Sequence, residues 1–379
     1  NDVVHIYAAQ LEVGTIATDY IDSGATTAKA GLLEDEPRFD YSGGATCPSL
    51  LIEKSRTNSI THSEYFGAWG AFRATITDNA TSSPEGIINA AVLTEDTTNN
   101  SHPLNKAFSV SSGVEYTLSI FAKQGSRRYL ALLALNGGST IYYDLENKTA
   151  GSGGSVEDYG NGWLRLIYTY TTNSTSADLY IQPSINGSSV VYTGDGSNAV
   201  FLYGAQLEAS AIASSYIPAH GASVTRGADN SYTGTTSGII GQTQGVVFCE
   251  FIYRAFAEDM RLGISDGTSA NFNNIRITSA GTLFVLGAAS SVLQYEINGG
   301  ALTDGQTYKV ALKYNTNDIE VFVNGVSKGT DTSATIGACN RFGFDNRSAG
   351  ANPFYSDVKK AILFNTALSD ADCITLTTL

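Results

Sequence analysis

Aromatic and amide side chains are the groups in this sequence that could recognise a sugar. A sugar ring packs its C–H face on an aromatic ring, while amides and carboxylates bind its hydroxyl groups. Trp69 lies in the segment FGAWGAF, where it could serve as such a platform or anchor the first strand on a core. Tyr142 and Tyr143 are neighbours in an alternating segment, so one of them faces outward if the strand is solvated on one side. All three are candidate ligand contacts.

The loop at residues 341–355 is the preferred candidate for a binding surface. It mixes charged and amide groups with aromatic rings, as a carbohydrate site requires. A solvated loop without a ligand has a similar composition, so both interpretations stay open. The candidate contacts are Arg341, Asp345, Asn346, Arg347 and Tyr355.

A second polar loop contains Asp266, Thr268 and Asn271. Carboxylate and amide oxygens bind calcium, so Asp266 and Asn271 are candidate ligands for such an ion. The same residue types also form ordinary turns. Calcium is the one cofactor that the sequence suggests.

Signatures of hydrolytic enzymes are missing or out of place. Residues 263–267 match G-x-S-x-G, but a nucleophile elbow joins a strand to a helix, and this segment lies between predicted strands. The four histidines share no metal-binding spacing. The last domain lacks the pair of carboxylates that glycoside hydrolysis needs. We therefore expect a protein that is not an enzyme.

Charge and hydropathy exclude two classes of partner. The chain has 379 residues, and its formal net charge is −14. Such an acidic surface repels phosphate groups, so we expect no nucleic-acid partner. No apolar run approaches the roughly 20 residues that a spanning helix needs, so we expect no membrane insertion. The four cysteines match no zinc pattern or disulfide framework, and a bond between Cys339 and Cys373 is left open.

Alternating strands joined by tight turns must position these residues. Asn324 and Gly325 are the predicted turn of a hairpin, and Ser369 is the predicted N-cap of a short terminal helix. The pattern predicts an all-β protein with antiparallel β-sandwiches, or jelly rolls, in tandem. Strands are predicted at residues 116–123, 129–135, 140–145, 163–171, 177–182, 274–278, 282–287, 292–297, 309–314, 319–323 and 358–364.

An internal repeat suggests where the domains divide. Residues 9–21 (AQLEVGTIATDYI) and 205–217 (AQLEASAIASSYI) are identical at eight of thirteen positions. The second copy ends a long β-rich region, so we interpret the first as the closing strand of an earlier module. The expected parts are this closing strand at 1–23, an extended connector at 24–55 that Leu51 and Ile52 anchor on the next domain, a jelly roll at 56–225 and a second sandwich at 226–379.

Two segments of the last domain carry a family resemblance. They are YKVALKYNTNDIEVFVNGVSKG, with an asparagine-glycine turn, and GFDNRSAGANPFYSDVKKAILFNTALSDADCITL, which ends the domain. They resemble the strand pair and the closing strand of laminin-G-like, concanavalin A-like lectin domains. The resemblance covers residues 226–379. It implies a two-sheet jelly roll of a family that often binds glycans, sometimes through calcium.

The segments PRFDY, LLIEKSRTNSITHSEYF, YTLSIFAK, NGWLRLIYTYT and YGAQLEASAIASSYIP cover most of residues 37–218. They resemble carbohydrate-binding jelly rolls of phage structural proteins. The resemblance implies a non-catalytic virion or extracellular protein, in a tail fibre or as a capsid decoration, that attaches to a host through a polysaccharide or other surface glycan. Other virion proteins would be its partners, and a homotrimer would pair the strand at residues 3–12 between chains. The alternatives are structural glue between virion subunits and non-catalytic modules of a larger polysaccharide-degrading enzyme.

Overall fold

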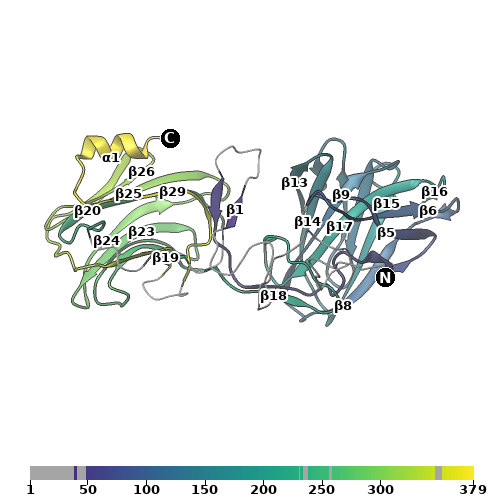
Figure 1. Ribbon diagram of the computed structural model, residues 1–379, viewed down its shortest axis with the longest axis horizontal. Helices are drawn as coiled ribbons and strands as arrows, with labels where there is room; N and C mark the ends of the chain where they lie inside the picture. Colours follow the sequence, from purple (N-terminus) through teal and green to yellow (C-terminus); the bar gives the residue numbers. More distant parts are fainter. Residues whose placement is uncertain (1–37, 41–47, 230, 234–237, 256–257, 346–351) are drawn as a thin grey trace, which may run out of the picture. The chain divides into compact units, whose positions relative to one another are not determined.

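The computed structural model describes residues 38–40, 48–229, 231–233, 238–255, 258–345 and 352–379 (Figure 1). The regular secondary structure of these residues is almost entirely antiparallel β-sheet, and the residues divide into two compact units. The first unit contains residues 56–226. The second contains residues 227–379 together with residues 48–55 and the strand at 38–40. The predicted fold class, all-β with antiparallel sandwiches, is confirmed.

Two six-stranded sheets build the first unit. One has the order β12 (Thr149–Ala150), β11 (Thr140–Asp144), β10 (Tyr129–Ala134), β15 (Ser176–Ser184), β8 (Leu104–Ser109) and β4 (Gly70–Ala71). The other has the order β13 (Gly154–Gly160), β14 (Trp163–Thr171), β9 (Glu115–Gln124), β17 (Asn198–Glu208), β6 (Ile88–Glu95) and β5 (Ala74–Ser82). The unit also contains the pairs β16 (Tyr192–Thr193) with β7 (Asn99–Asn100) and β18 (Val224–Arg226) with β3 (Arg56–Asn58), and the 3-10 turn η2 (Phe66–Ala68).

Period-two alternation along the strands creates the core of the first unit. Leu118 and Ile120 of β9 and Leu164 of β14 lie in the main apolar cluster. Phe121 of β9 and Trp163 of β14 point to the opposite face, where they form a smaller cluster. Successive side chains of a strand face opposite ways, so one strand contributes to both clusters. Each buried leucine-sized side chain stabilises the fold by about 2 kcal/mol.

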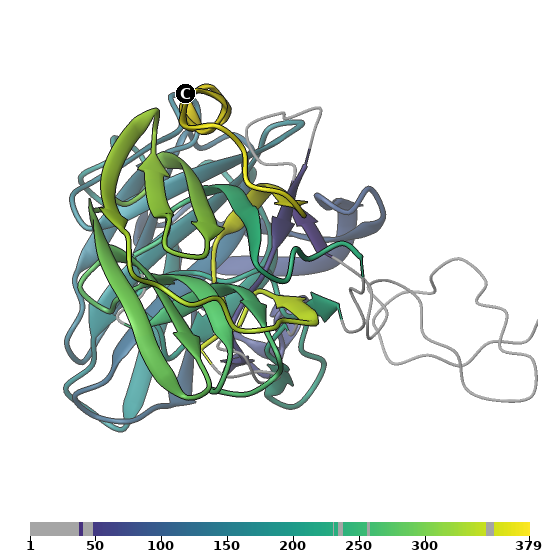
Figure 2. The same ribbon diagram turned by 90° about the vertical axis from the view of Figure 1, so that its left-hand side faces the viewer.

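A seven-stranded and a six-stranded sheet build the second unit, whose strands appear in teal, green and yellow in Figure 2 apart from the purple β1 and β2. The larger sheet has the order β1 (Arg38–Asp40), β2 (Ser49–Leu51), β29 (Asp357–Phe364), β20 (Gln244–Ile252), β25 (Thr307–Asn315), β26 (Ile319–Val323) and β27 (Val326–Asp331). The smaller has the order β19 (Tyr232–Thr233), β28 (Arg341–Gly343), β21 (Met260–Ser265), β22 (Phe272–Ile277), β23 (Thr282–Ala289) and β24 (Val292–Ala301).

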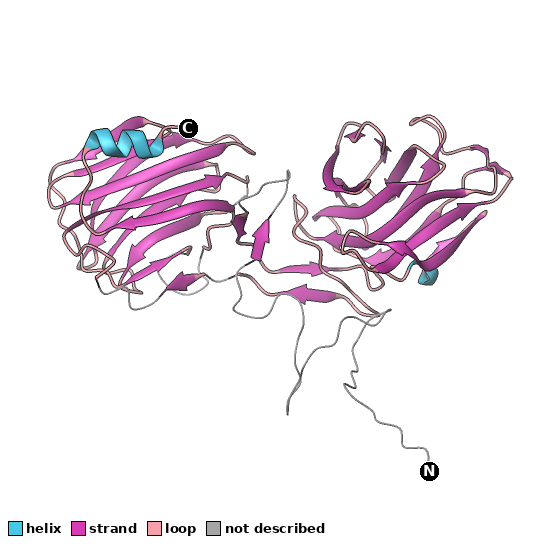
Figure 3. Ribbon diagram, turned by 45° about the horizontal axis from the view of Figure 1, so that its top comes forward, coloured by secondary structure: helices cyan, strands magenta, loops and turns pink. Residues whose placement is uncertain are grey.

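The helix α1 (Asp370–Thr377) lies against the larger sheet of the second unit and is drawn in cyan in Figure 3. The Ser369 hydroxyl accepts a hydrogen bond from the Asp372 backbone N–H at 3.1 Å, so the predicted N-cap is confirmed. Cys373 of the helix packs on Phe248 of β20. The helix therefore covers an apolar patch on the face of β20 that points away from the sandwich core.

The predicted hairpin turn is also confirmed. Asn324 and Gly325 connect β26 to β27, and their φ angles are 49° and 78°. A two-residue turn of this kind needs positive φ at both positions, which asparagine and glycine adopt most readily. This turn chemistry is the reason why the sequence could place the hairpin so accurately.

The expected connector at residues 24–55 is corrected by the structure for its described part. β1 and β2 pair with each other, and β2 pairs with β29, so this segment extends the larger sheet of the second unit. Ile52 is only 2% exposed in the core of that unit. Ile52 therefore packs in the second unit, which is formed mainly by a much later part of the chain, and not in the jelly roll that follows it directly in sequence. Pairing over such a distance leaves no local signal.

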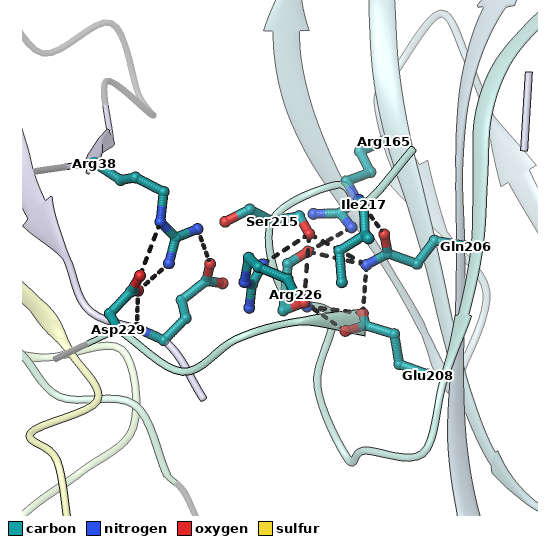
Figure 4. A network of polar contacts seen from close by, with 10 residues as sticks. Arg38, Arg165, Gln206, Glu208, Ser215, Ile217, Arg226 and Asp229 are labelled. Atoms are coloured by element: carbon teal, nitrogen blue, oxygen red, sulfur yellow. Dashed lines mark hydrogen bonds and ion pairs between the residues drawn. The ribbon is translucent and has the colours of Figure 1, made fainter. Parts of the chain in front are cut away.

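An ion-pair network fastens this segment within the second unit. Arg38 donates from Nη1 to Glu53 at 2.6 Å and from Nε to Asp229 at 3.2 Å (Figure 4). The Glu53 backbone N–H also donates to Asp229 at 2.6 Å. Arg38 is 8% exposed, and a buried guanidinium needs such partners.

The cysteines of the described residues are separate thiols. Cys339 lies in the core of the second unit, Cys373 lies under α1, and both are unbonded, so the disulfide left open by the sequence is absent. Burial raises the pKa of Cys339 to about 12 and that of Cys373 to about 11. Thiols of this kind stay protonated and unreactive. Cys47 lies outside the described residues.

Within the described part of the chain, no helix is long and apolar enough to cross a membrane.

Candidate functional site

A pocket of about 540 Å³ opens at one end of the second unit. Antiparallel pairing explains how distant segments meet there. The end of β2 lies beside the start of β29, and the end of β22 lies beside the start of β21. The residues that follow or precede these strand ends line the pocket: Lys54, Glu258, Asp259, Ser279, Asn352, Pro353 and Tyr355.

Two carboxylates stand at the pocket, and each has a cationic partner. Glu258 forms an ion pair with Lys54. Asp259 accepts hydrogen bonds from Arg276, at 2.5 Å from Nη2 and 3.0 Å from Nε. The other oxygen of Asp259 accepts from the backbone N–H of Ser279 at 3.1 Å. This bond holds the loop after β22 in place, with the Ser279 side chain exposed.

The apolar side of the pocket comes from residues just before β29. Tyr355 is 4% exposed, and the Lys54 ammonium lies 6.0 Å from the centre of its ring. Pro353 is buried beside it. Asn352 has a φ of 47°, and its carbonyl accepts a hydrogen bond from the Arg261 N–H at 3.1 Å. Asparagine tolerates this left-handed conformation better than most residues, and it presents an exposed amide at the pocket.

This combination suits a ligand rich in hydroxyl groups. The carboxylates accept hydrogen bonds, the ammonium donates them, and the hydroxyl and amide groups do both. A few fixed polar groups around an apolar patch are typical of small-ligand sites. The described residues contain no group of three or more His, Cys, Asp or Glu side chains that could hold a metal ion.

Among the predicted contacts in the loop at residues 341–355, Tyr355 lines the pocket and two others do not. Arg341 and Asp345 form a buried ion pair, with Nη1 of Arg341 donating to Asp345 at 2.7 Å. They are 8% and 2% exposed, and the guanidinium lies 4.3 Å from the ring centre of Tyr232. The predicted ligand role is wrong for Arg341 and Asp345, because the two side chains already neutralise each other in a buried ion pair. Asn346 and Arg347 lie outside the described residues.

Trp69 is a core residue and not a sugar platform. Its side chain is 5% exposed and packs on Phe66 and Phe108. The indole N–H donates to the backbone carbonyl of His62 at 3.1 Å. A glycan has no access to either face of a ring packed in this way.

Tyr143 is also corrected from a ligand contact to a core residue. It is fully buried, its hydroxyl donates to the Ile167 carbonyl at 2.7 Å, and burial raises its pKa far above the usual range. Tyr142 points to the opposite face of β11 and is half-buried. It does not line the pocket.

The polar loop at Asp266 closes on itself. Asp266 accepts hydrogen bonds from the Thr268 N–H at 2.8 Å and from the Asn271 amide at 2.7 Å. The Asn271 side-chain oxygen accepts from the Ser290 N–H at 3.0 Å. Burial disfavours the Asp266 carboxylate, but these hydrogen bonds outweigh it and lower its pKa. Both candidate calcium ligands therefore already serve to fix the loop.

Sequence reasoning missed what the polar residues of the repeat motif do. Glu208 is fully buried and accepts from the Gln206 side chain at 2.6 Å and from the Ser214 N–H at 2.9 Å. Gln206 accepts in turn from the Ile217 N–H at 2.6 Å (Figure 4). These bonds fasten residues 209–217, which we call the strap, to β17. Alternating Gln and Glu inside an apolar strand was the available signal.

A buried carboxyl group lies near the end of the strap. Glu64 is 7% exposed, and its side chain accepts from the hydroxyls of Tyr216 at 3.0 Å and Tyr203 at 3.3 Å. Burial disfavours the charged form and raises its pKa. Glu64 is buried and hydrogen-bonded to Tyr203 and Tyr216, so we assign this cluster a role in the stability of the first unit.

Comparison with known proteins adds the following. A family model described as the concanavalin A-like lectin/glucanases superfamily (Laminin_G_3) matches residues 226–373. Similar solved structures include the CBM40 of Ruminococcus gnavus IT-sialidase bound to alpha2,3 sialyllactose, with 19% identity, coverage of 37% of this chain and 84% of that chain, and a TM-score of 0.32. They also include domains LG4-5 of the mouse laminin alpha1 chain, with 14% identity, coverage of 72% and 92%, and a TM-score of 0.26.

No curated protein matches the chain. The matched residues supply every strand of the second unit except β1 and β2. Their two antiparallel sheets have the sandwich architecture of the matching family. Residues 226–373 therefore combine a match to this family model with a fold of two antiparallel sheets.

Proposed function

We propose that the second unit binds a glycan in the pocket lined by Lys54, Glu258, Asp259, Ser279, Asn352, Pro353 and Tyr355. The observation that carries the proposal is this set of fixed polar groups around a proline and a tyrosine. Sugar hydroxyls match the polar groups. Tyr355 is 4% exposed, so it forms part of the pocket wall and offers no open ring face to a sugar. The lectins named in the description of the matching family support this proposal.

Binding without catalysis is the form of activity that we propose. Two-carboxylate glycoside hydrolysis needs one protonated acid and one carboxylate that is available as a base or nucleophile. Glu258 is paired with Lys54, and Asp259 with Arg276 and the Ser279 N–H. Neither carboxylate is arranged for proton transfer to a glycosidic oxygen.

We propose further that the chain serves in a virion, as a tail fibre or capsid decoration that attaches to a host surface glycan. The support is the resemblance of residues 37–218 to jelly rolls of phage structural proteins. Immunogold labelling of purified particles tests the location. Competition for adsorption by the purified chain tests attachment, and cross-linking tests for a homotrimer. Particles without the chain would remove the virion proposal and leave glycan binding intact.

A blocking variant tests the pocket. The full chain is applied to an array of bacterial and animal glycans, alongside Ser279→Trp and Thr316→Trp. Ser279 is exposed and lines the pocket, while Thr316 is an exposed turn residue between β25 and β26. We expect Ser279→Trp to weaken binding at least about tenfold, because the indole fills the space of a sugar ring. Thr316→Trp should bind as the native chain does.

Two outcomes of the array experiment would contradict the proposal. No binding to any glycan by the folded chain contradicts the function. Equal binding by Ser279→Trp contradicts the site.

A further inference from the structure

We propose that the pocket of the second unit selects uncharged glycans and excludes acidic ones, such as those that carry sialic or uronic acids. The inference rests on the glycan-binding function proposed above and names its ligand class. It follows from how the charged groups around the pocket are paired.

The cation inside the pocket is held by a carboxylate. Lys54 forms its ion pair with Glu258, and the two side chains are 27% and 52% exposed. The ring of Tyr355 lies on another side of the ammonium, at 6.0 Å. An acidic sugar would have to compete with Glu258 for Lys54 while it approached a second carboxylate, that of Asp259.

Two arginines at this end of the unit, Arg276 and Arg254, are paired as well. Arg276 donates two hydrogen bonds to Asp259, and Arg254 donates two to Asp357, at 3.0 Å and 3.1 Å. Among the described residues that line the pocket, Lys54 is the cation and Glu258 and Asp259 are the carboxylates, so this lining has no excess of positive charge. Recognition of a carboxylate ligand commonly uses an arginine fork, and both forks here already hold carboxylates.

A neutral sugar meets no such obstacle. A hydroxyl group both donates and accepts, so it can donate to Glu258 and accept from Lys54 while the ion pair stays intact. A ligand carboxylate can only accept, and it would face Glu258 and Asp259 at short range. The arrangement of charges thus favours the ligand that leaves every pair in place.

The test uses matched pairs of neutral and acidic glycans, such as lactose and 3′-sialyllactose, on the same array with the full chain. We expect the neutral member of each bound pair to bind at least about tenfold more tightly. Preferential binding of acidic members would overturn the inference and leave the glycan-binding function standing. Binding of neither kind would overturn both.

A charge variant tests the cause. Glu258→Gln keeps the size of the side chain and releases Lys54 from its anionic partner. We expect the ratio of acidic to neutral affinity to rise about tenfold in this variant. The matched control is Glu296→Gln, which removes one negative charge from an exposed position on β24. An unchanged ratio in Glu258→Gln, or an equal rise in Glu296→Gln, would contradict the role of the Lys54–Glu258 pair.

Discussion

Single residues in this chain show how burial decides between binding and structure. Arg341 and Tyr143 have the chemistry of glycan contacts, but the structure places both inside, with Asp345 and the Ile167 carbonyl as partners. Composition and alternation cannot separate a buried ion pair from a polar surface, because both use the same residue types. Period two indicates that Tyr142 and Tyr143 face opposite ways, but not which of the two faces the core.

The buried Glu64 gives a pH prediction at the residue scale. Its folded-state pKa is raised by burial, so the folded chain holds the proton more tightly than the unfolded chain does. Its contribution to stability is thus fully present below the unfolded pKa of about 4.3 and is lost as pH rises through the folded pKa. Glu64→Gln keeps an acceptor for Tyr203 and Tyr216 and carries no charge to desolvate.

We therefore expect Glu64→Gln to gain stability over the native chain as pH rises from about 4 to 7. Urea unfolding at both pH values measures this gain in the free energy of unfolding of the first unit. Glu115→Gln, at an exposed position, is the control and should show no such trend. A difference between Glu64→Gln and the native chain that stays constant with pH would contradict the assignment.

At the scale of elements, the sequence predicted the strands, turns and caps that depend on residues close together in the chain. The strand predicted at residues 163–171 has the same bounds as β14, and the Asn324-Gly325 turn and the Ser369 cap were placed correctly. Each of these depends on neighbours in sequence. β2 was missed because its partner β29 lies about 300 residues further along the chain, and β1 joins the sheet only through β2. The pocket was missed for a similar reason, since Lys54 follows a strand of the larger sheet and Ser279 a strand of the smaller one, and only the fold brings both to one pocket.

The strap gives a stability prediction at this scale. Glu208→Ala removes the acceptor of the buried Ser214 N–H and the shortest hydrogen bond of the Gln206 amide, which keeps only bonds of 3.4 Å to the Ser214 and Ser215 carbonyls. The expected cost is about 2–3 kcal/mol of unfolding free energy, measured by urea denaturation of the first unit. Glu115→Ala, at an exposed site, should cost less than about 0.5 kcal/mol. A cost for Glu208→Ala as small as that of the control would show that the strap is held by other contacts.

The same polar residues recur in the first copy of the repeat. Gln10, Glu12 and Ile21 correspond to Gln206, Glu208 and Ile217, and Thr18 keeps the hydroxyl of Ser214. These positions lie outside the described residues. The closing strand expected at residues 1–23 therefore stays a prediction.

The whole molecule combines sandwich units in an acidic chain with few charged groups. The net charge of −14 discourages anionic ligands at long range, and the paired charges at the pocket discourage them at short range. Sheets carry the fold, and strand ends of the second unit carry the candidate site.

The central claim is that a glycan occupies the pocket between β2, β21, β22 and the start of β29. Hydrogen–deuterium exchange of the full chain, with and without the neutral glycan that binds most tightly on the array, tests it most directly. The account predicts slower exchange in peptides that contain Lys54, Asp259, Ser279 and Tyr355, and unchanged exchange in the strap of the first unit. Protection that appears only in peptides of the first unit would contradict it.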